Sequence, residues 1–447
     1  MNRRIRHSRE GGNPSRWIPA FAGMTAVVML ACGFSASAQD LLIRNATVHT
    51  VTDRGALEGA DVLVRDGRIA EVGTGLDAAG VQVVEAEGRP LTPAMFGGIT
   101  GIGIEEVSAE EPTTDASLGL GLLTNQMTVR PEFDVTLAYN PASVLVPVAR
   151  VDGIGWTLLG ANTTDGGSII GGQGGVMRLD GSPGPIGERV LFVRLGGGTA
   201  ELTGNSRAAQ WMLLDQLVAE ARGRISPESK HSLLTPAGRD TLRGYLDDGG
   251  RMVVGIHRAA DIRQLLRWSD RHDVNIAIAG GAEAWKLAPQ LAAAGVPVFV
   301  DPLQNLPGSF DTIAATLQNA ARLHRAGVAV SFVQAGDSSH NARKLRQLAG
   351  NAVANGLPWE AGLAGLTRVP AQVLGVDDQL GTIAVGQRAD LVLWTGDPLE
   401  VSSVALQLWL DGRAIPMESR QTELRDRYLR TQQAPAEGGL PRAYPAR

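Results

Sequence analysis

The second half of the chain alternates short apolar strands with helical segments, and this alternation restricts the fold more than any other feature. Four strand patterns, MVVGIH, NIAIAG, VPVFV and VAVSFV, lie between residues 252 and 333. A helical pattern follows each of them, the third over residues 310–327 and the fourth over residues 341–356. Strands that are apolar on both faces are typical of a parallel sheet covered by helices. The sequence therefore predicts a parallel α/β domain.

Residues 93–375 are about as long as a complete (β/α)8 barrel, which typically has ~250 residues. A doubly wound open sheet is the alternative. The first half of this segment is less regular, because residues 160–198 are rich in glycine and indicate β or loop excursions. Neither a dinucleotide-binding GxGxxG after a strand nor a P-loop pattern occurs there, so phosphate binding is not indicated.

Strand patterns also occur at both ends of the chain. LLIRNATVHTV and ADVLVRDGRIAEVG stand near the front, and ADLVLWTGDP and VALQLWLDGRAI near the back. The second and the fourth contain the dipeptides Asp66-Gly67 and Asp411-Gly412, which predict tight hairpin turns because both central residues need a positive φ. Two strand clusters at opposite ends can form one domain.

We therefore predict a (β/α)8 TIM-like barrel inserted into a small β-sandwich. The composite sandwich comprises residues 39–92 and 376–416, and the barrel comprises residues 93–375. Residues 417–447 are predicted to form a charged helix and a mobile tail.

The first 38 residues have the pattern of a signal peptide. Residues 26–34, AVVMLACGF, follow several arginines and precede Ala36-Ser37-Ala38, a small-x-small cleavage pattern. We expect cleavage after Ala38 and a periplasmic or secreted protein of a Gram-negative bacterium. The start codon, at Met1 or Met24, stays open. The apolar stretch is too short to span a membrane, and we expect no integral membrane segment in the mature chain.

Composition excludes some partners. The net charge of −5 provides no basic surface, so we do not expect nucleic acid as a partner. A small molecule or short peptide at the barrel mouth is the expected ligand, and a homodimer is the default assembly.

The end segments carry a family resemblance. DLLIRNATVHTV and AEGRPLTP at the front, with TRVPAQVLGVDDQLGTIAVGQRADLVLWTGDPL at the back, are similar to the metal-dependent amidohydrolase superfamily, imidazolonepropionase-like branch. The resemblance implies a barrel inserted into a β-sandwich. It also implies hydrolysis of C–N bonds in amides or cyclic amides with one or two divalent metals.

The family's usual metal ligands are largely missing from the matching positions. Its His-x-His at the end of the first barrel strand aligns with Ile99 and Gly101, and its histidine after the sixth strand aligns with Gly280 or Gly281. A fourth-strand lysine is excluded, since no lysine precedes Lys230. We therefore expect no binuclear centre, and at most one divalent metal such as zinc.

Two residues that could act in catalysis are still present at positions where the family has catalytic residues. His257 ends the strand pattern MVVGIH, and Asp337 follows the last strand. We predict both as catalytic residues, and as metal ligands only if a reduced metal site persists. The alternatives are a hydrogen-bonded polar residue for His257 and a helix N-cap for Asp337.

Other polar residues have weaker functional interpretations. His340 could replace a lost ligand, and Glu283 could coordinate a metal or cap a helix. For Glu105 and Glu106 a solvated loop is preferred over a role as carboxylate ligands, and for Trp285 packing is preferred over lining the pocket. Four further histidines are predicted to be structural or exposed: His49, His231, His272 and His324.

Three functional hypotheses follow. The first is an exported hydrolase acting on cyclic amide-like or dipeptide C–N bonds with a depleted centre. The second is an inactive amidohydrolase-like pseudoenzyme that binds a small molecule or a partner protein. The third is a structural subunit paired with an active homologue.

Overall fold

The computed structural model describes residues 40–77, 79–108, 110–119 and 129–433. The predicted signal peptide and residues 434–447 of the predicted tail lie outside these ranges. Within the described segments, no helix is both long and apolar enough to cross a membrane.

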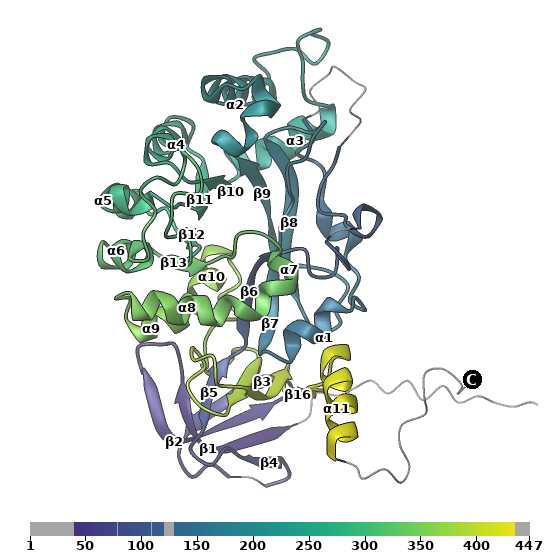
Figure 1. Ribbon diagram of the computed structural model, residues 1–447, viewed down its shortest axis with the longest axis vertical. Coiled ribbons are helices and arrows are strands. Elements are labelled where there is room, and N and C mark those ends of the chain that lie inside the picture. Colours follow the sequence, from purple (N-terminus) through teal and green to yellow (C-terminus); the bar gives the residue numbers. More distant parts are fainter. Residues whose placement is uncertain (1–39, 78, 109, 120–128, 434–447) are drawn as a thin grey trace, which may run out of the picture. The chain divides into compact units, whose positions relative to one another are not determined.

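Eight strands form the barrel sheet, and their order around the sheet follows their order in the chain (Figure 1). They are β6 (Met95–Thr100), β7 (Ile154–Leu159), β8 (Ile170–Arg178), β9 (Ile186–Arg194), β10 (Arg251–Ile256), β11 (Asn275–Gly280), β12 (Val298–Val300) and β13 (Val330–Phe332). The two edges approach each other, since a Cβ built at Gly98 of β6 would lie 4.0 Å from the carbonyl oxygen of Phe332. The TIM-like barrel prediction is confirmed.

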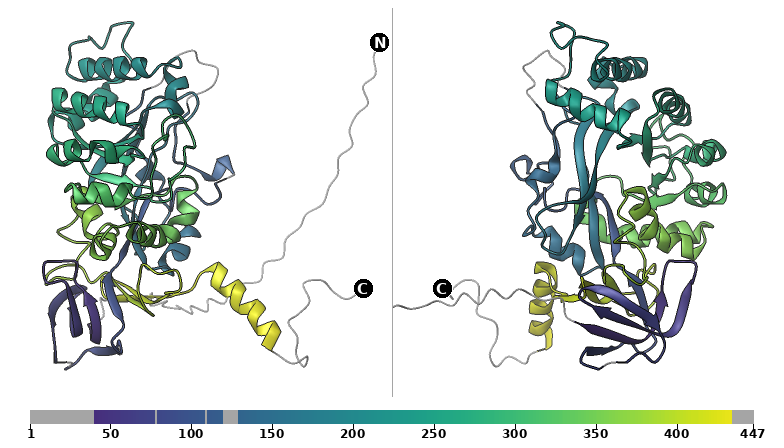
Figure 2. Two further views of the ribbon diagram at one scale, coloured as in Figure 1. Left: turned by 60° about the vertical axis from the view of Figure 1, so that its left-hand side comes forward. Right: turned by 180° about the vertical axis from the view of Figure 1, so that it is seen from behind.

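Helices cover the outside of strands β10 to β13, as Figures 1 and 2 show in teal and green. They are α4 (Ala259–His272), α5 (Ala288–Ala293), α6 (Asn319–Arg325) and α8 (Leu345–Ala354). The helix predicted over residues 310–327 is shorter than expected. Asp311 forms an ion pair with Arg207, and the Thr312 hydroxyl donates a hydrogen bond to the carbonyl oxygen of Ser309. These side-chain contacts compete with helical hydrogen bonding before residue 319.

The glycine-rich segment forms β8, which runs antiparallel to both of its neighbours. This orientation departs from the all-parallel barrel that the family resemblance implies. A Cβ at Gly174 would lie 1.9 Å from the carbonyl oxygen of Leu159 and 2.7 Å from the ring of Phe192. Glycine is therefore required at this position by the close approach of β7 and β9.

The second sheet combines strands from both chain ends, in the order β16-β15-β14-β5-β1-β2-β3, with β4 paired to β1. Its strands are β1 (Leu41–His49), β2 (Ala56–Arg65), β3 (Arg68–Gly73), β4 (Gln82–Glu85), β5 (Pro90–Pro93), β14 (Leu391–Trp394), β15 (Ala405–Leu410) and β16 (Arg413–Ile415). Antiparallel pairing of β5 with β14 joins the two ends. Asp66 and Asp411 have φ of 49° and 51° in the two predicted hairpin turns.

The remaining α-helices are α1 (Leu145–Arg150), α2 (Arg207–Ala221), α3 (Pro236–Asp247), α7 (Ser338–Asn341), α9 (Trp359–Ala364), α10 (Arg368–Val373) and α11 (Arg420–Gln433). Helix α11 lies within the segment for which the sequence predicts a charged C-terminal helix. Barrel strands and their helices share one large apolar core, and other side chains of the barrel strands form a second one. The front strands pack a separate core with β14.

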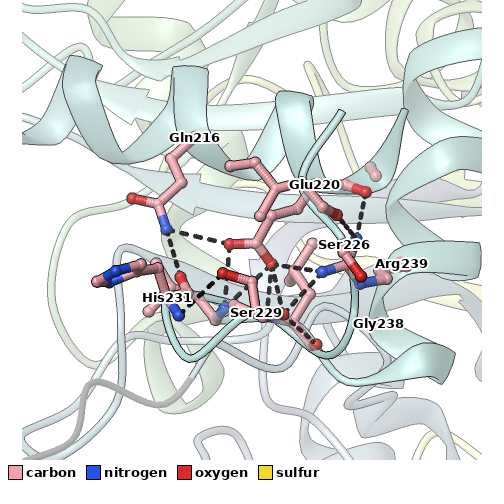
Figure 3. A network of polar contacts seen from close by, with 12 residues as sticks. Gln216, Glu220, Ser226, Ser229, His231, Gly238 and Arg239 are labelled. Atoms are coloured by element: carbon pink, nitrogen blue, oxygen red, sulfur yellow. Dashed lines mark hydrogen bonds and ion pairs between the residues drawn. The ribbon is translucent and has the colours of Figure 1, made fainter. Parts of the chain in front are cut away.

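A buried ion pair connects α2 with α3 (Figure 3). Glu220 is fully buried, and Arg239 donates to its carboxylate over 3.2 Å. The same carboxylate accepts the backbone N–H groups of Leu233 and Leu234 at 3.0 Å and the hydroxyl of Ser232 at 3.1 Å. One side chain therefore holds the connection between the two helices in place.

Replacing Glu220 by glutamine should lower the free energy of unfolding by about 2–3 kcal/mol, because an amide group removes the charge and one of two acceptor oxygens from buried donors. Urea unfolding would measure the change. Glu228→Gln is the matched control, since Glu228 is exposed and bonds only locally, to Ser226. Equal midpoints for the two variants would contradict the assigned role of Glu220.

Candidate functional site

A cavity of about 540 Å³ lies at the ends of the barrel strands. Its polar lining comes from residues at or just after the carboxyl ends of strands: Arg194 from β9, His257 after β10, Asp301 after β12 and Asp337 after β13. Ile99 of β6 and Gly280 of β11 complete this side of the wall. In barrels of this type the carboxyl ends of the strands form the active-site face.

His257 lies in this cavity as a largely desolvated imidazole. Burial lowers its pKa below the ordinary value of 6.5, and the positive charge of Arg194 acts in the same direction, while Asp311, Gln304 and Asp301 oppose them. The Nδ1 atom is buried and has no hydrogen-bond partner among the described residues. At neutral pH the ring is therefore uncharged, and its buried Nδ1 is unpartnered.

Gly280 makes room for this ring. Its φ is +90°, and a Cβ built there would lie 2.4 Å from Cε1 and 2.9 Å from Nδ1 of His257. Any larger side chain at position 280 would displace the imidazole. The conformation of His257 thus excludes a metal-binding side chain on the end of β11.

Asp337 is part of a second polar group at the same mouth. His340 Nδ1 lies 2.9 Å from Asp337 Oδ1 and 3.9 Å from Glu105 Oε1. Ser339 donates to Glu105 Oε2 over 2.6 Å and accepts the backbone N–H of Gly101 over 2.9 Å. One ligand atom from each of Glu105, Asp337 and His340 lies within 4.8 Å of the others.

Among the described residues, this group offers the ligand atoms for a divalent metal. An imidazole and two carboxylates are suitable ligands for zinc. Ile99 and Gly280 offer no ligand atom to a second ion, and the Arg194 guanidinium places a positive charge on the same wall. His257 lines the cavity but lies outside the ligand group, so the two predicted ligands are not brought into one cluster of described residues.

The comparisons with known proteins find similarity over parts of the chain. A family model described as the amidohydrolase family matches residues 268–417. The amidohydrolase tasK of Hapsidospora irregularis is 48% identical over 59 residues, which are 13% of this chain and only 6% of that protein. These matches show that part of this chain is similar to amidohydrolases.

Solved structures agree at the level of the fold. An amidohydrolase from Thermotoga maritima superposes with a TM-score of 0.73 at 23% identity, covering 84% of this chain and 99% of that chain. A prolidase complexed with N-methylphosphonate-L-proline superposes with a TM-score of 0.51 at 14% identity, with the same coverage of both chains. The imidazolonepropionase-like branch stays a prediction.

Several site interpretations are changed by the structure. The solvated-loop interpretation is wrong for Glu105, whose side chain is only 12% exposed. Glu106 instead accepts the backbone N–H of Val144, in a part-exposed loop. Asp337 stands at the N-cap position of α7, but its side chain makes no capping hydrogen bond and its φ is 39°.

Glu283 and Trp285 have structural roles. Glu283 accepts the backbone N–H of Ala259 at the start of α4 and that of Ala314, so it caps a neighbouring helix. Trp285 donates to the carbonyl of Ala314 and lies under the guanidinium of Arg322, so it has a packing role.

Sequence reasoning missed three residues at the mouth. Arg194 ends β9, Asp301 follows β12, and Ser339 joins Glu105 to the first strand. Arg194 and Asp301 carry a signal, because each is the first charged residue after an apolar strand run. Ser339 carries none, because its contacts depend on a pairing across 234 residues.

Proposed function

We propose that this protein hydrolyses the C–N bond of a small cyclic amide or dipeptide in the barrel-mouth cavity. The observation that carries the proposal is the uncharged imidazole of His257, with an unpartnered nitrogen, in a cavity lined also by Arg194 and Asp337. A neutral imidazole can accept a proton from water, and the guanidinium of Arg194 can stabilise the negative charge that develops on the carbonyl oxygen.

The remaining residues fit the same reaction. Asp337 is oriented by His340 and can transfer a proton to the departing nitrogen. Glu105, Asp337 and His340 would hold a single divalent ion such as zinc. When bound, such an ion polarises the carbonyl group of the substrate.

A second candidate is binding without turnover. It is favoured by Ile99, Gly101 and Gly280, which stand where the family resemblance implies metal ligands and have none to offer. In that case the cavity would still bind a small amide, because its size and its polar wall do not depend on a metal.

Metal analysis combined with a substrate screen separates the two candidates. The purified protein is expected to hold no more than one divalent ion per chain, and to hydrolyse a member of a panel of dipeptides and cyclic amides. Turnover is measured with and without a chelator. Two tightly bound ions per chain would contradict the depleted centre. Binding of an amide with no release of amine would favour the second candidate.

The variant Asp337→Asn should reduce hydrolysis by about a hundredfold, because the amide cannot transfer a proton. It should also lower the metal content, since an amide is a poorer ligand than a carboxylate. Asp270→Asn is the control, as Asp270 lies exposed on α4, away from the cavity. Unchanged turnover and metal content in Asp337→Asn would remove Asp337 from its assigned role.

We also propose export, on the pattern of residues 1–38 alone. Cell fractionation and the mass of the mature protein test it, with Gln39 as the expected first residue. A full-length cytoplasmic protein would overturn it.

A further inference from the structure

A second cavity, of about 510 Å³, lies between the β-sandwich strands and the helices α9 and α10. Its wall includes the end of β1, the turn that leads into β2, and the first residues of both helices. None of its lining residues belongs to the barrel-mouth cavity. Cavities of this size are typical of small-molecule sites.

The apolar side of this cavity is built around two rings. The ring centroids of His49 and Trp359 lie 4.8 Å apart, tilted by 45°. Burial lowers the pKa of His49, so the imidazole is uncharged at neutral pH and packs as an aromatic group. Val51 and Leu363 extend the apolar wall. Such a wall suits an aromatic or branched aliphatic body.

The charged side is provided by Arg368, the first residue of α10. No hydrogen bond or ion pair joins its guanidinium to any residue in the described parts of the chain. Its Nε is buried without a partner. Because arginine stays charged and no described residue accepts from its guanidinium, this group can pair with an anion. A carboxylate can do so through two parallel hydrogen bonds.

The two acids beside the cavity do not neutralise Arg368. Asp397 accepts the indole N–H of Trp359 on both oxygens, at 3.1 and 2.9 Å, and the backbone N–H of Leu399 at 2.8 Å. Glu360 is exposed to solvent. Arg368 is therefore the charge left available to a ligand.

The backbone is also strained at one residue that lines this second cavity. Val51 has a φ of 55°, in the left-handed region that β-branched residues avoid. Strained conformations of this kind persist only where the surroundings hold them, and they are concentrated at ligand-binding and catalytic sites. Val51 lines this second cavity and takes no part in the barrel-mouth site.

We propose that this cavity binds a small carboxylate with an aromatic or branched aliphatic body. The carboxylate pairs with Arg368, and the body packs against His49 and Trp359. This site is separate from the barrel mouth and does not depend on hydrolysis there.

Isothermal titration of the full chain with 3-phenylpropionate tests the proposal. We expect binding, with 3-phenylpropionamide (no charge) and acetate (no apolar body) at least about tenfold weaker, since a hydrogen bond to a charged group is lost in one and the apolar contact in the other. Arg368→Gln should weaken 3-phenylpropionate by about tenfold or more. Ala56→Trp should block binding, because Ala56 is exposed and lines the cavity.

Two control variants locate the site. Arg325→Gln removes an exposed arginine of α6 and should bind like the parent. Arg194→Gln should do the same, since Arg194 lines only the barrel mouth. Loss of binding in Arg194→Gln but not in Arg368→Gln would overturn the proposal. Absence of binding to the parent, or equal binding of the acid and the amide, would overturn it as well.

Discussion

Replacing Arg178 by methionine should lower the free energy of unfolding by about 3–5 kcal/mol, as expected when one partner of a buried ion pair is removed. Arg178 of β8 is 4% exposed and pairs with Asp180, with Asp390 at 2.9 Å and with Asp411 at 2.9 Å. Burial raises the pKa of Asp390 although Arg178 lowers it, so this carboxylate depends on the guanidinium. Methionine retains the apolar volume of the side chain and leaves two buried acids, Asp180 and Asp390, without their ion-pair partner.

Urea unfolding of three further variants separates lost pairing from lost packing: Arg388→Gln, Asp390→Asn and the double variant Arg178→Met/Asp390→Asn. Arg388 is 25% exposed and also pairs with Asp411, so Arg388→Gln should cost no more than about 1 kcal/mol. Adding Asp390→Asn to Arg178→Met should recover part of the loss, because one of the two unpaired buried charges is removed. A double variant as unstable as the sum of the two single variants would show that packing, and not the ion pair, is the main contribution.

The position of Arg178 explains why its ion pairs with Asp390 and Asp411 should contribute strongly to the free energy of unfolding. It lies on a barrel strand, whereas Asp390 precedes β14 and Asp411 forms the hairpin turn between β15 and β16. The ion pair therefore links the barrel to the composite sheet across 212 residues of sequence. Loss of the pair should loosen the attachment between the two.

The parts of the fold that local sequence patterns encode could be predicted. The apolar runs that became β10 to β13 alternate with helices at a regular spacing, and the turns at Asp66 and Asp411 have the dipeptide that a tight hairpin needs. The direction of β8 was not predictable. Glycine is needed on β8 because β7 and β9 approach it closely, as at Gly174. This close approach arises only when the sheet has formed, so the local sequence does not indicate it.

The same limit applies to the site. His257 and Asp337 could be predicted because each follows a strand that the sequence marks clearly. Glu105 could not, because its burial depends on Ser339, which reaches it from beyond the last barrel strand. Unpartnered atoms such as Nδ1 of His257 are likewise a property of the folded chain alone.

The variant His257→Gln should reduce hydrolysis by about a thousandfold, because an amide cannot act as the proton acceptor. Since burial lowers the pKa of His257, kcat/KM of the parent should fall on the acid side with a midpoint below pH 6.5. The contribution of His257 to the free energy of unfolding also decreases as the pH falls. The unfolded chain takes up the proton more readily than the folded one, so the contribution of His257 is present above its unfolded pKa and is lost as the pH falls from that value through the folded pKa.

The comparison with His324→Gln gives this prediction its control, because His324 is exposed on α6 and lies outside the cavity. That variant should have the activity and pH profile of the parent. A purely structural role for His257 predicts a lower melting temperature for His257→Gln but an unchanged acid limb in its remaining activity. A catalytic role predicts that the limb disappears, because no titrating base remains. An acid limb that persists in His257→Gln would assign the proton transfer to another group.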